Sequence, residues 1–450
     1  MHKQPGISLF FAALLGGAMA VGCNPSSDLR VSSSQLSVIG SAAENAIPNQ
    51  FIIQLPESIS SEALAAVKDR IAARADGSRV MFDYDLIPAF AAELSQEALL
   101  EILSDPAVSR VEANREITIN TEYPSEPDGL DRTDQRTLPH DGVYNDHGND
   151  GAGTNVYIID TGIRTTHVEF TGRIGTAVDF VTPGGSGEDC NGHGTHVAST
   201  AAGSAYGLAK AATLHAVRVL DCGGSGSYAG VIAGIDHVRT DCANQAGPCV
   251  ANMSLGGARS QALNDAVTAA VAAGVTFVVA AGNETTDACT RSPASTATAI
   301  TVGAADDDDE IASFSNKGFC VDIFAPGVSI LGADSDSDTD TQIISGTSMA
   351  SPHVAGAVAL YLGNNPSATP ADVADALAYS ATPGCVTGLD LFTNNALLYN
   401  DFSSAGAGQG CVANSCVGSC GHRAPAGCYC DKDCAAFGDC CPDKADECGN

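Results

Sequence analysis

Apolar and polar positions follow two periods between residues 49 and 119. Short apolar runs predict strands at 50–55, 79–86, 89–94 and 108–119. Two stretches with helical spacing, 60–73 and 95–106, lie between these runs, and Ser95 is placed to cap the second helix. The resulting order β-α-β-β-α-β is typical of a small α+β domain.

From about residue 150 to 382, continuous apolar runs alternate with helical stretches. Such an alternation predicts a mainly parallel sheet covered by helices on both faces, which is a three-layer αβα fold. Ligands of such folds bind beyond the carboxyl ends of the strands, where Asp160 and Asn283 fall. The strands are expected at 155–160, 213–221, 250–257, 275–283 and 299–306, and the helices at 196–205, 228–240 and 261–274.

The two ends of the chain differ in amino-acid composition from the segments between them. Residues 1–23 combine Lys3 with an apolar run and the small-residue site Ala18-Met19-Ala20, which is typical of a signal peptide for export. The residues up to Cys23 also resemble a bacterial lipobox, so the precursor is either cleaved or lipid-anchored at Cys23. Residues 416–450 hold too few apolar side chains for a core and need disulfides to fold.

Composition narrows the classes of function. A length of 450 residues predicts two or three domains. The net charge of -32 argues against nucleic acid and anionic membranes as partners, because both would repel this surface. Of 17 cysteines, removal of Cys23 leaves 17 − 1 = 16, and an even count in an exported chain favours disulfides.

Three short segments hold the residues of nucleophilic catalysis. "IIDTGI" places Asp160 at a strand end, "NGHGTHVAS" places His193 at a helix start, and "SGTSMASPHVAG" places Ser348 at another helix start. A serine hydroxyl becomes nucleophilic when a histidine takes its proton and a carboxylate orients that histidine. The N–H groups at a helix start also stabilise a developing oxyanion.

These segments closely resemble the subtilisin-like serine proteases. "VRVLDCGGSGSYAGVIAGIDHV", "VANMSLGG" and "SFSNKGFCVDIFAPG" are similar to the proteinase K branch, especially its aqualysin-like bacterial members, over residues 129–400. The resemblance implies a catalytic triad of Asp160, His193 and Ser348. It also implies an oxyanion hole formed by Asn283 and the backbone N–H of Ser348. Ser345 and Ser351 are expected to be local hydrogen-bonding residues.

The same resemblance implies how a peptide is bound. In the family, two short segments flank the substrate and bind it as an added strand. Small, uncharged walls predict an endopeptidase of broad specificity with an apolar or aromatic preference. The residues carried over are Gly223, Gly224, Ser225, Ser254, Leu255, Gly256, Ala281 and Gly282.

Disulfides are also implied by the resemblance, as Cys190–Cys222 and Cys289–Cys320. Cys242 and Cys249 are then left in one loop, and we expect them to pair. A bridge between Cys385 and Cys411 would tie the catalytic domain to the tail. An alternative reading of "CNGHGTH" is a metal site formed by Cys190, His193 and His196.

Two structural calcium sites are implied by the resemblance, and carboxylate and carbonyl oxygens suit that ion. The first uses Asp322 with the carbonyls of Ala297 and Ala299. The second uses Asp131, Asp134, Gln135 and Asp141, for which solvated acidic residues are the alternative. The acidic runs at 305–310 and 334–340 are expected to be solvated loops.

Residues 48–120 resemble a subtilisin propeptide, most clearly in "SDPAVSRVEAN", and cleavage is expected at Asn120–Thr121. The propeptide would be an intramolecular inhibitor, and a lipid anchor would leave with it, so the mature enzyme is expected to be secreted, extracellular and free of the membrane. The domains expected are a signal peptide 1–23, a linker 24–47, the propeptide 48–120, a catalytic domain 121–404, a linker 405–415 and a C-terminal module 416–450.

The spacing of eight cysteines in the tail resembles that of a somatomedin B domain. One interpretation is that the tail binds a protein partner. The other is that it is a disulfide-stapled spacer or a removable tail. Spacing alone leaves 105 connectivities open for these eight cysteines. The primary expectation is a monomeric enzyme that acts on protein and peptide substrates. The alternative is a catalytically silent secreted binding protein that acts through its tail. The cysteines are Cys416, Cys420, Cys428, Cys430, Cys434, Cys440, Cys441 and Cys448.

Overall fold

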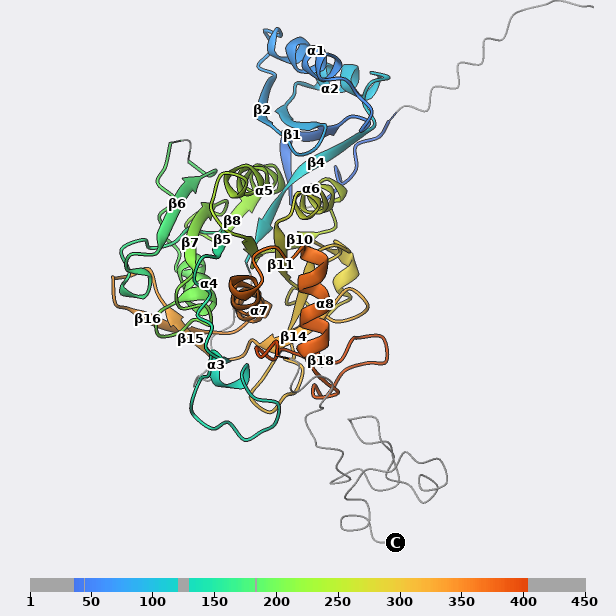
Figure 1. Ribbon diagram of the computed structural model, residues 1–450. Coiled ribbons are helices and arrows are strands. Elements are labelled where there is room, and N and C mark those ends of the chain that lie inside the picture. Colours follow the sequence, from blue (N-terminus) through green and yellow to red (C-terminus); the bar gives the residue numbers. More distant parts are fainter. Residues whose placement is uncertain (1–35, 44, 120–128, 183, 404–450) are drawn as a thin grey trace, which may run out of the picture. The chain divides into compact units, whose positions relative to one another are not determined.

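A computed structural model describes residues 36–43, 45–119, 129–182 and 184–403 (Figure 1). The C-terminal module and its cysteines, the signal peptide and the expected cleavage site lie outside the described residues. Within the described residues, no helix combines the length and the apolarity needed to cross a bilayer.

The first domain has the expected β-α-β-β-α-β order. Its four strands form an antiparallel sheet in the order β2-β3-β1-β4. Ile53, Phe90 and Val111 from the sheet pack against Val67 and Ile102 from the two helices. The elements are β1 (Ala46–Gln54), α1 (Ser61–Ala72), β2 (Arg79–Asp83), β3 (Ala89–Glu93), α2 (Gln96–Leu103) and β4 (Arg110–Thr118).

The second domain is built on a nine-stranded sheet in the order β17-β18-β14-β13-β11-β9-β5-β7-β6. Its strands are parallel except for the β17–β18 pair. The strands are β5 (Asn155–Asp160), β6 (Ile174–Asp179), β7 (Thr213–Arg218), β9 (Cys249–Met253), β11 (Thr276–Ala280), β13 (Ile300–Ala305), β14 (Ile323–Pro326), β17 (Thr382–Pro383) and β18 (Ala396–Leu397).

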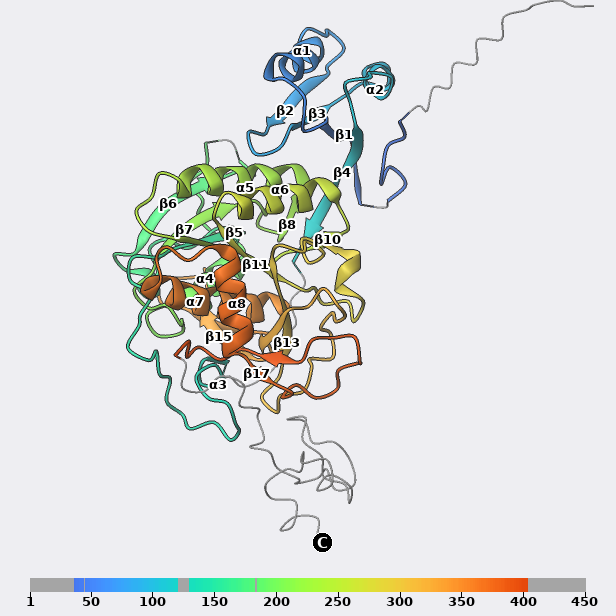
Figure 2. The ribbon, with the colours of Figure 1, turned by 45° about the vertical axis from the view of Figure 1, so that its right-hand side comes forward.

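Helices cover both faces of this sheet, as Figure 2 shows. Strand β5 demonstrates the two-sided burial, because Val156 and Ile158 enter the core with α4 and α7. Tyr157 and Ile159 enter the opposite core with α5 and α6. The helices are α4 (His193–Ala202), α5 (Tyr228–Cys242), α6 (Gln261–Ala272), α7 (Thr347–Asn364) and α8 (Pro370–Ser380). The fold is therefore the three-layer αβα fold expected from the sequence.

Shorter elements border the sheet and were mostly not predicted. The hairpin β15–β16 lies beside α4 and packs its Ile330 and Ile344 into the same core. The elements are α3 (Gly129–Arg132), η1 (Val168–Phe170), β8 (Ser225–Ser227), β10 (Gly257–Ala258), η2 (Ala288–Thr290), β12 (Arg291–Ser292), β15 (Ile330–Ala333) and β16 (Thr341–Ile344).

The acidic run at 305–310 is not a fully solvated loop, contrary to the expectation. Asp309 is buried, and its two carboxylate oxygens pair with Nε and Nη2 of Arg132 at 2.7 and 2.9 Å. The Arg132 side chain is 2% exposed and that of Asp309 is 8% exposed. The ion pair fastens α3 to a loop 177 residues further along the chain.

Strand β4 of the first domain continues onto the second domain (Figure 1). Glu116, Ile117 and Thr118 pair antiparallel with β8. Next to this pairing, the Glu112 carboxylate accepts hydrogen bonds from the Ser260 hydroxyl (2.8 Å) and from Ala262 N (3.2 Å), at the start of α6. The first domain therefore reaches the carboxyl-end edge of the sheet, where ligands of such folds bind.

Candidate active site

Asp160 is the last residue of β5 and is fully buried. Its Oδ1 accepts a hydrogen bond from His193 Nδ1 at 2.7 Å and from Thr161 N at 2.7 Å. A carboxylate on Nδ1 places the proton there and leaves Nε2 as the basic nitrogen. His193 Nε2 is buried and has no hydrogen-bond partner among the described residues.

The turn before α4 holds His193 in place. Gly192, the residue before the helix, has φ 101°, which favours glycine. A Cβ on Gly194 would collide with the carbonyl oxygen of Gly162, so the histidine is packed against the strand end that carries Asp160. Both glycines of "GHG" are therefore required by the local geometry.

Asp189 organises the same turn and was not singled out from the sequence. Its Oδ1 accepts from Asn191 N (2.9 Å) and Gly192 N (3.1 Å). Its Oδ2 accepts from the backbone N (2.9 Å) and the hydroxyl (2.6 Å) of Thr195. An aspartate close before a helix start is the signal that would have found it.

Ser348 is the second residue of α7 and is buried. Its hydroxyl donates to the carbonyl oxygen of Ser254 at 3.1 Å. Ser254 Oγ in turn donates to the carbonyl oxygen of Ser348 at 2.7 Å, which joins α7 to the end of β9. Ser351 and Ser345 also make local hydrogen bonds, to Asn252 Oδ1 and from Ser329 N, both at 2.7 Å.

Asn283 follows β11 and is oriented by Thr347. Its Oδ1 accepts from the backbone N (2.9 Å) and the hydroxyl (2.8 Å) of Thr347. The carbonyl end of the amide is thereby held toward α7, and the NH₂ group points away from Thr347. The side chain of Asn283 and the start of α7 line one pocket together with Ser348.

The cleft beside Ser348 lies between the two segments expected to flank a peptide. Ile119 N donates to Gly224 O at 3.2 Å, and Thr118 forms an antiparallel bridge with Gly256. Ser254, Leu255, Gly256, Ala281 and Gly282 line the pocket, together with Thr118 and Ile119. The end of β4 therefore occupies this cleft as an added strand.

Two charged residues that the sequence reasoning missed also line the pocket. Glu284 directly follows Asn283, and Arg291 belongs to β12. Glu284 Oε1 and Arg291 Nε are 3.6 Å apart. The pocket walls are therefore small but not uncharged.

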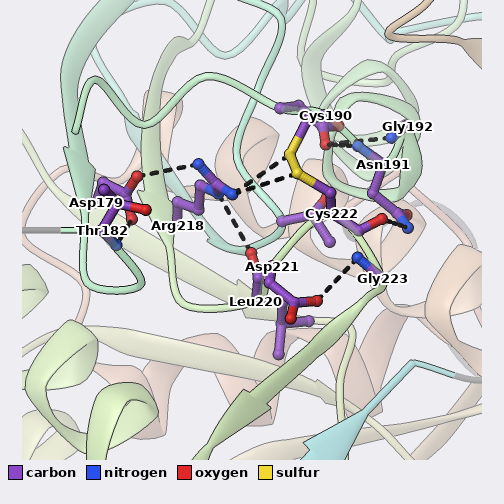
Figure 3. The surroundings of a disulfide bond; sticks show 12 residues. Asp179, Thr182, Cys190, Asn191, Gly192, Arg218, Leu220, Asp221, Cys222 and Gly223 are labelled. Atoms are coloured by element: carbon purple, nitrogen blue, oxygen red, sulfur yellow. Dashed lines mark hydrogen bonds and ion pairs between the residues drawn. A yellow bond between two sulfur atoms is a disulfide. The ribbon is translucent and has the colours of Figure 1, made fainter.

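Within the described residues there are three disulfides, at the pairs expected: Cys190–Cys222, Cys242–Cys249 and Cys289–Cys320. The first joins the turn before His193 to the segment that begins at Gly223 (Figure 3). Arg218 Nη2 contacts the Cys190 sulfur at 3.3 Å, and Arg218 Nη1 pairs with Asp179 Oδ2 at 3.0 Å. Cys385 is also disulfide-bonded, and Cys411, its expected partner, lies outside the described residues.

The alternative metal site does not form. Cys190 is consumed by its disulfide. His196 Nε2 contacts the carbonyl oxygen of Ile330 at 2.9 Å, and burial lowers the pKa of His196 to about 3. No group of three or more His, Cys, Asp or Glu side chains with the arrangement of a metal site occurs in the described part of the chain.

The acidic residues near α3 nevertheless fit a hard cation in part. Asp131 Oδ1 is buried without a hydrogen-bond partner among the described residues, while Oδ2 accepts from Gly142 N at 2.8 Å. Burial, with the nearby carboxylates of Asp131 and Asp141, raises the pKa of Asp134 to about 6. The backbone oxygen of Gln135 accepts from Arg132 Nη1 at 2.5 Å and so is already engaged.

The other expected ligand set includes Asp322, which directly precedes β14. Asp322 Oδ2 accepts from Thr301 N at 2.8 Å, and burial raises the pKa of Asp322. Ala299, whose carbonyl is the expected second ligand, is buried two residues before Thr301 in the chain, and Ala297 precedes it. A buried carboxylate with one oxygen engaged is compatible with a cation on the other.

Comparison with known proteins identifies extensive similarity. A sequence model of the subtilase family matches residues 151–408. An extracellular serine proteinase of Thermus sp. (strain Rt41A) is 47% identical over 407 residues, which cover 86% of this chain and 98% of that protein. A cuticle-degrading serine protease of Arthrobotrys oligospora is 42% identical over 388 residues, covering 81% and 94%. The crystal structure of a cold adapted subtilisin-like serine proteinase matches with 49% identity and a TM-score of 0.58, over 61% of this chain and 97% of that one.

Proposed function

The chain belongs to the subtilase family of serine peptidases, and on this basis we propose that it is a secreted endopeptidase whose triad is Asp160, His193 and Ser348. The observation that carries the proposal is the buried hydrogen bond between Asp160 Oδ1 and His193 Nδ1, which leaves the buried Nε2 as the basic nitrogen. Export is supported by the signal-like residues 1–23 and by the extracellular serine proteinase among the relatives.

The proposed reaction follows from the protonation states. Ser348 Oγ turns from the Ser254 carbonyl to His193 Nε2, which takes its proton as Oγ attacks the peptide carbonyl carbon. Asp160 stabilises the imidazolium formed. The proton then passes from Nε2 to the leaving amine, and water releases the acyl group from Ser348 by the same steps in reverse order.

The oxyanion of the intermediate needs donors that are already in position. We assign this role to Asn283 Nδ2 and to the backbone N–H of Ser348. Thr347 supports the assignment, because its two hydrogen bonds engage the Asn283 carbonyl oxygen and so distinguish it from the NH₂ end of the amide. Donors of this kind act strongly since they need no reorganisation during the reaction.

We propose that residues 48–120 are an inhibitory propeptide. Thr118 and Ile119 occupy the cleft between Gly224 and Gly256, where a substrate strand would bind. Glu112 at the start of α6 adds a second attachment. Cleavage after Asn120 would free the cleft, and release of this domain would activate the enzyme.

Calcium is proposed as a structural ion. The carboxylates of Asp131, Asp134 and Asp141 would hold one ion, and Asp322 with the carbonyls of Ala297 and Ala299 another. The buried Asp131 Oδ1 without a partner among the described residues supports the first site. A bound ion would supply the positive charge that these neighbouring carboxylates otherwise lack.

The test compares the intact masses of wild type and Ser348→Ala after expression with export and calcium. We expect wild type to lose residues 1–120 and the variant to keep its propeptide. Ser367→Ala is the matched control, because Ser367 is an exposed serine beyond α7 and its loss should leave processing unchanged. Retention of the propeptide by wild type, or its loss from Ser348→Ala, would contradict the proposal.

A further inference from the structure

The pocket beside Ser348 contains one charged pair. Glu284 and Arg291 both line it, and every other described residue of its wall is uncharged. Their side chains are 29% and 28% exposed, so the pair is largely removed from solvent. It lies where a substrate side chain next to the cut bond would enter.

The pair is held in place but incompletely satisfied. Glu284 Oε2 accepts from Asn316 Nδ2 at 2.7 Å, and Asn316 Oδ1 accepts from Glu284 N at 3.1 Å, which fixes the carboxylate. Arg291 lies opposite Ala258 in the β10–β12 ladder, which fixes its backbone. Arg291 Nε is buried and makes no hydrogen bond within the described residues, since 3.6 Å to Glu284 Oε1 is beyond hydrogen-bond distance.

A substrate side chain can complete this arrangement only if it offers both an acceptor and a donor. The oxygen of a primary amide would accept from the Arg291 guanidinium, and its NH₂ group would donate to Glu284. An apolar side chain would bury both charges without replacing their solvent. An aspartate would be repelled by Glu284, and a lysine by Arg291.

We propose that Glu284 and Arg291 determine specificity by selecting asparagine or glutamine as the residue before the cut bond. This inference rests on the proposed protease function and replaces the apolar or aromatic preference expected from the walls alone. The expected cleavage site of the propeptide is consistent with this preference. Ile119 is the last described residue in the cleft, and the next residue in the chain is Asn120, after which cleavage is expected.

The test uses peptides with the sequence of residues 115–124, REITINTEYP, in which the position of Asn120 is varied to Gln, Leu, Phe, Asp or Lys. With processed wild type, we expect kcat/KM for Asn and Gln to exceed that for Leu and Phe by about tenfold or more, because a site built for a polar group discriminates strongly against its absence. Equal or faster cleavage of the Leu or Phe peptide would overturn the inference.

Two variants assign the effect to the pair. Arg291→Met should remove the preference for Asn over Leu. Glu284→Gln, which keeps the shape of the side chain, should raise the Asp-to-Asn ratio of kcat/KM by about fivefold or more, because the repulsion of an acidic side chain is removed. This second variant keeps the inference testable if the first does not fold.

The matched control is Asp390→Asn. Asp390 pairs with Lys317 at the same 3.6 Å but does not line the pocket, so its loss should not change the Asp-to-Asn ratio. An unchanged ratio in Glu284→Gln would contradict the inference while leaving the protease function intact. Failure to cleave any peptide would reject the protease function and the inference together.

Discussion

Loss of the Cys190–Cys222 disulfide is a perturbation whose cost can be worked out from the structure. The bridge closes a loop with a sequence separation of 32 residues, which includes His193 and all of α4. Cys242–Cys249 closes a loop with a separation of only 7. The two bridges differ in loop length and also in burial, because Cys190 and Cys222 are exposed whereas Cys249 is buried in the core.

A disulfide stabilises the folded state by restricting the unfolded chain, and the restriction grows with loop length. In the chain-entropy relation, a loop of 32 residues corresponds to about 3.7 kcal/mol at 25 °C and one of 7 to about 2.4 kcal/mol. Replacing both cysteines of each bridge by alanine, which puts no hydroxyl at the buried Cys249, should thus cost about 1.3 kcal/mol more for the longer loop from loop closure. Loss of the longer bridge also removes the contacts of Arg218 Nη2 with the two sulfur atoms, while the ion pair of Arg218 with Asp179 does not depend on the sulfur atoms (Figure 3).

The free energy of unfolding should be measured by guanidinium titration in a Ser348→Ala background, which prevents self-digestion. Far-UV circular dichroism is the suitable signal, because the chain has no tryptophan. The shift in midpoint at constant slope gives the loss of stability. An equal loss for both bridges, or a larger one for Cys242–Cys249, would refute the loop-length argument.

Three further predictions test other contacts. Asp189→Asn should lower kcat about tenfold with little change in KM, because the turn that holds His193 loses part of its acceptor set; an unchanged kcat in peptide hydrolysis would show that the turn holds without it. Arg132→Met should cost about 3–5 kcal/mol in guanidinium unfolding by removing the guanidinium that pairs with the buried Asp309 carboxylate, and the double variant Arg132→Met/Asp309→Leu should recover much of it. No recovery would contradict the pairing argument. Burial lowers the pKa of His353 to about 4, so the unfolded chain takes up this proton first, and the contribution of His353 to stability, which is present above about pH 6.5, should fall by about 2 kcal/mol at pH 5. A His353→Gln variant should show a correspondingly smaller loss between pH 7 and pH 5.

Much of the fold follows from local pattern. Strand β5 has buried residues on both faces, and its continuous apolar run Val156–Ile159 predicts a strand inside a parallel sheet. Ser95 caps α2 through Ala98 N, as its position before an apolar helical stretch indicates. These features depend on neighbours within a few residues, so the sequence contains them directly.

The segments of the candidate site were also evident from the sequence, because nucleophile, base and carboxylate each lie in a distinctive local motif. Their supporting residues were less evident. Asp189 was not singled out from the sequence, and only the structure shows that four hydrogen-bond donors surround its carboxylate. A residue that acts by accepting hydrogen bonds from backbone N–H groups is hard to recognise from its amino-acid type alone.

Charge is where local pattern and tertiary structure disagree most. Asp309 belongs to a run of acidic residues that reads as a solvated loop, yet it is buried against Arg132 from far earlier in the chain. Glu284 and Arg291 line the pocket, whose walls were expected to be uncharged. The sequence by itself determined the inner strands β5, β7, β9, β11 and β13, most of the covering helices and the reactive side chains, since these follow from periodicity and local motifs. The strands β6, β14, β17 and β18 and the helix α8 were not predicted. Only the tertiary structure decided which charges are buried and what faces them, because that depends on the elements that the topology brings together from distant parts of the chain.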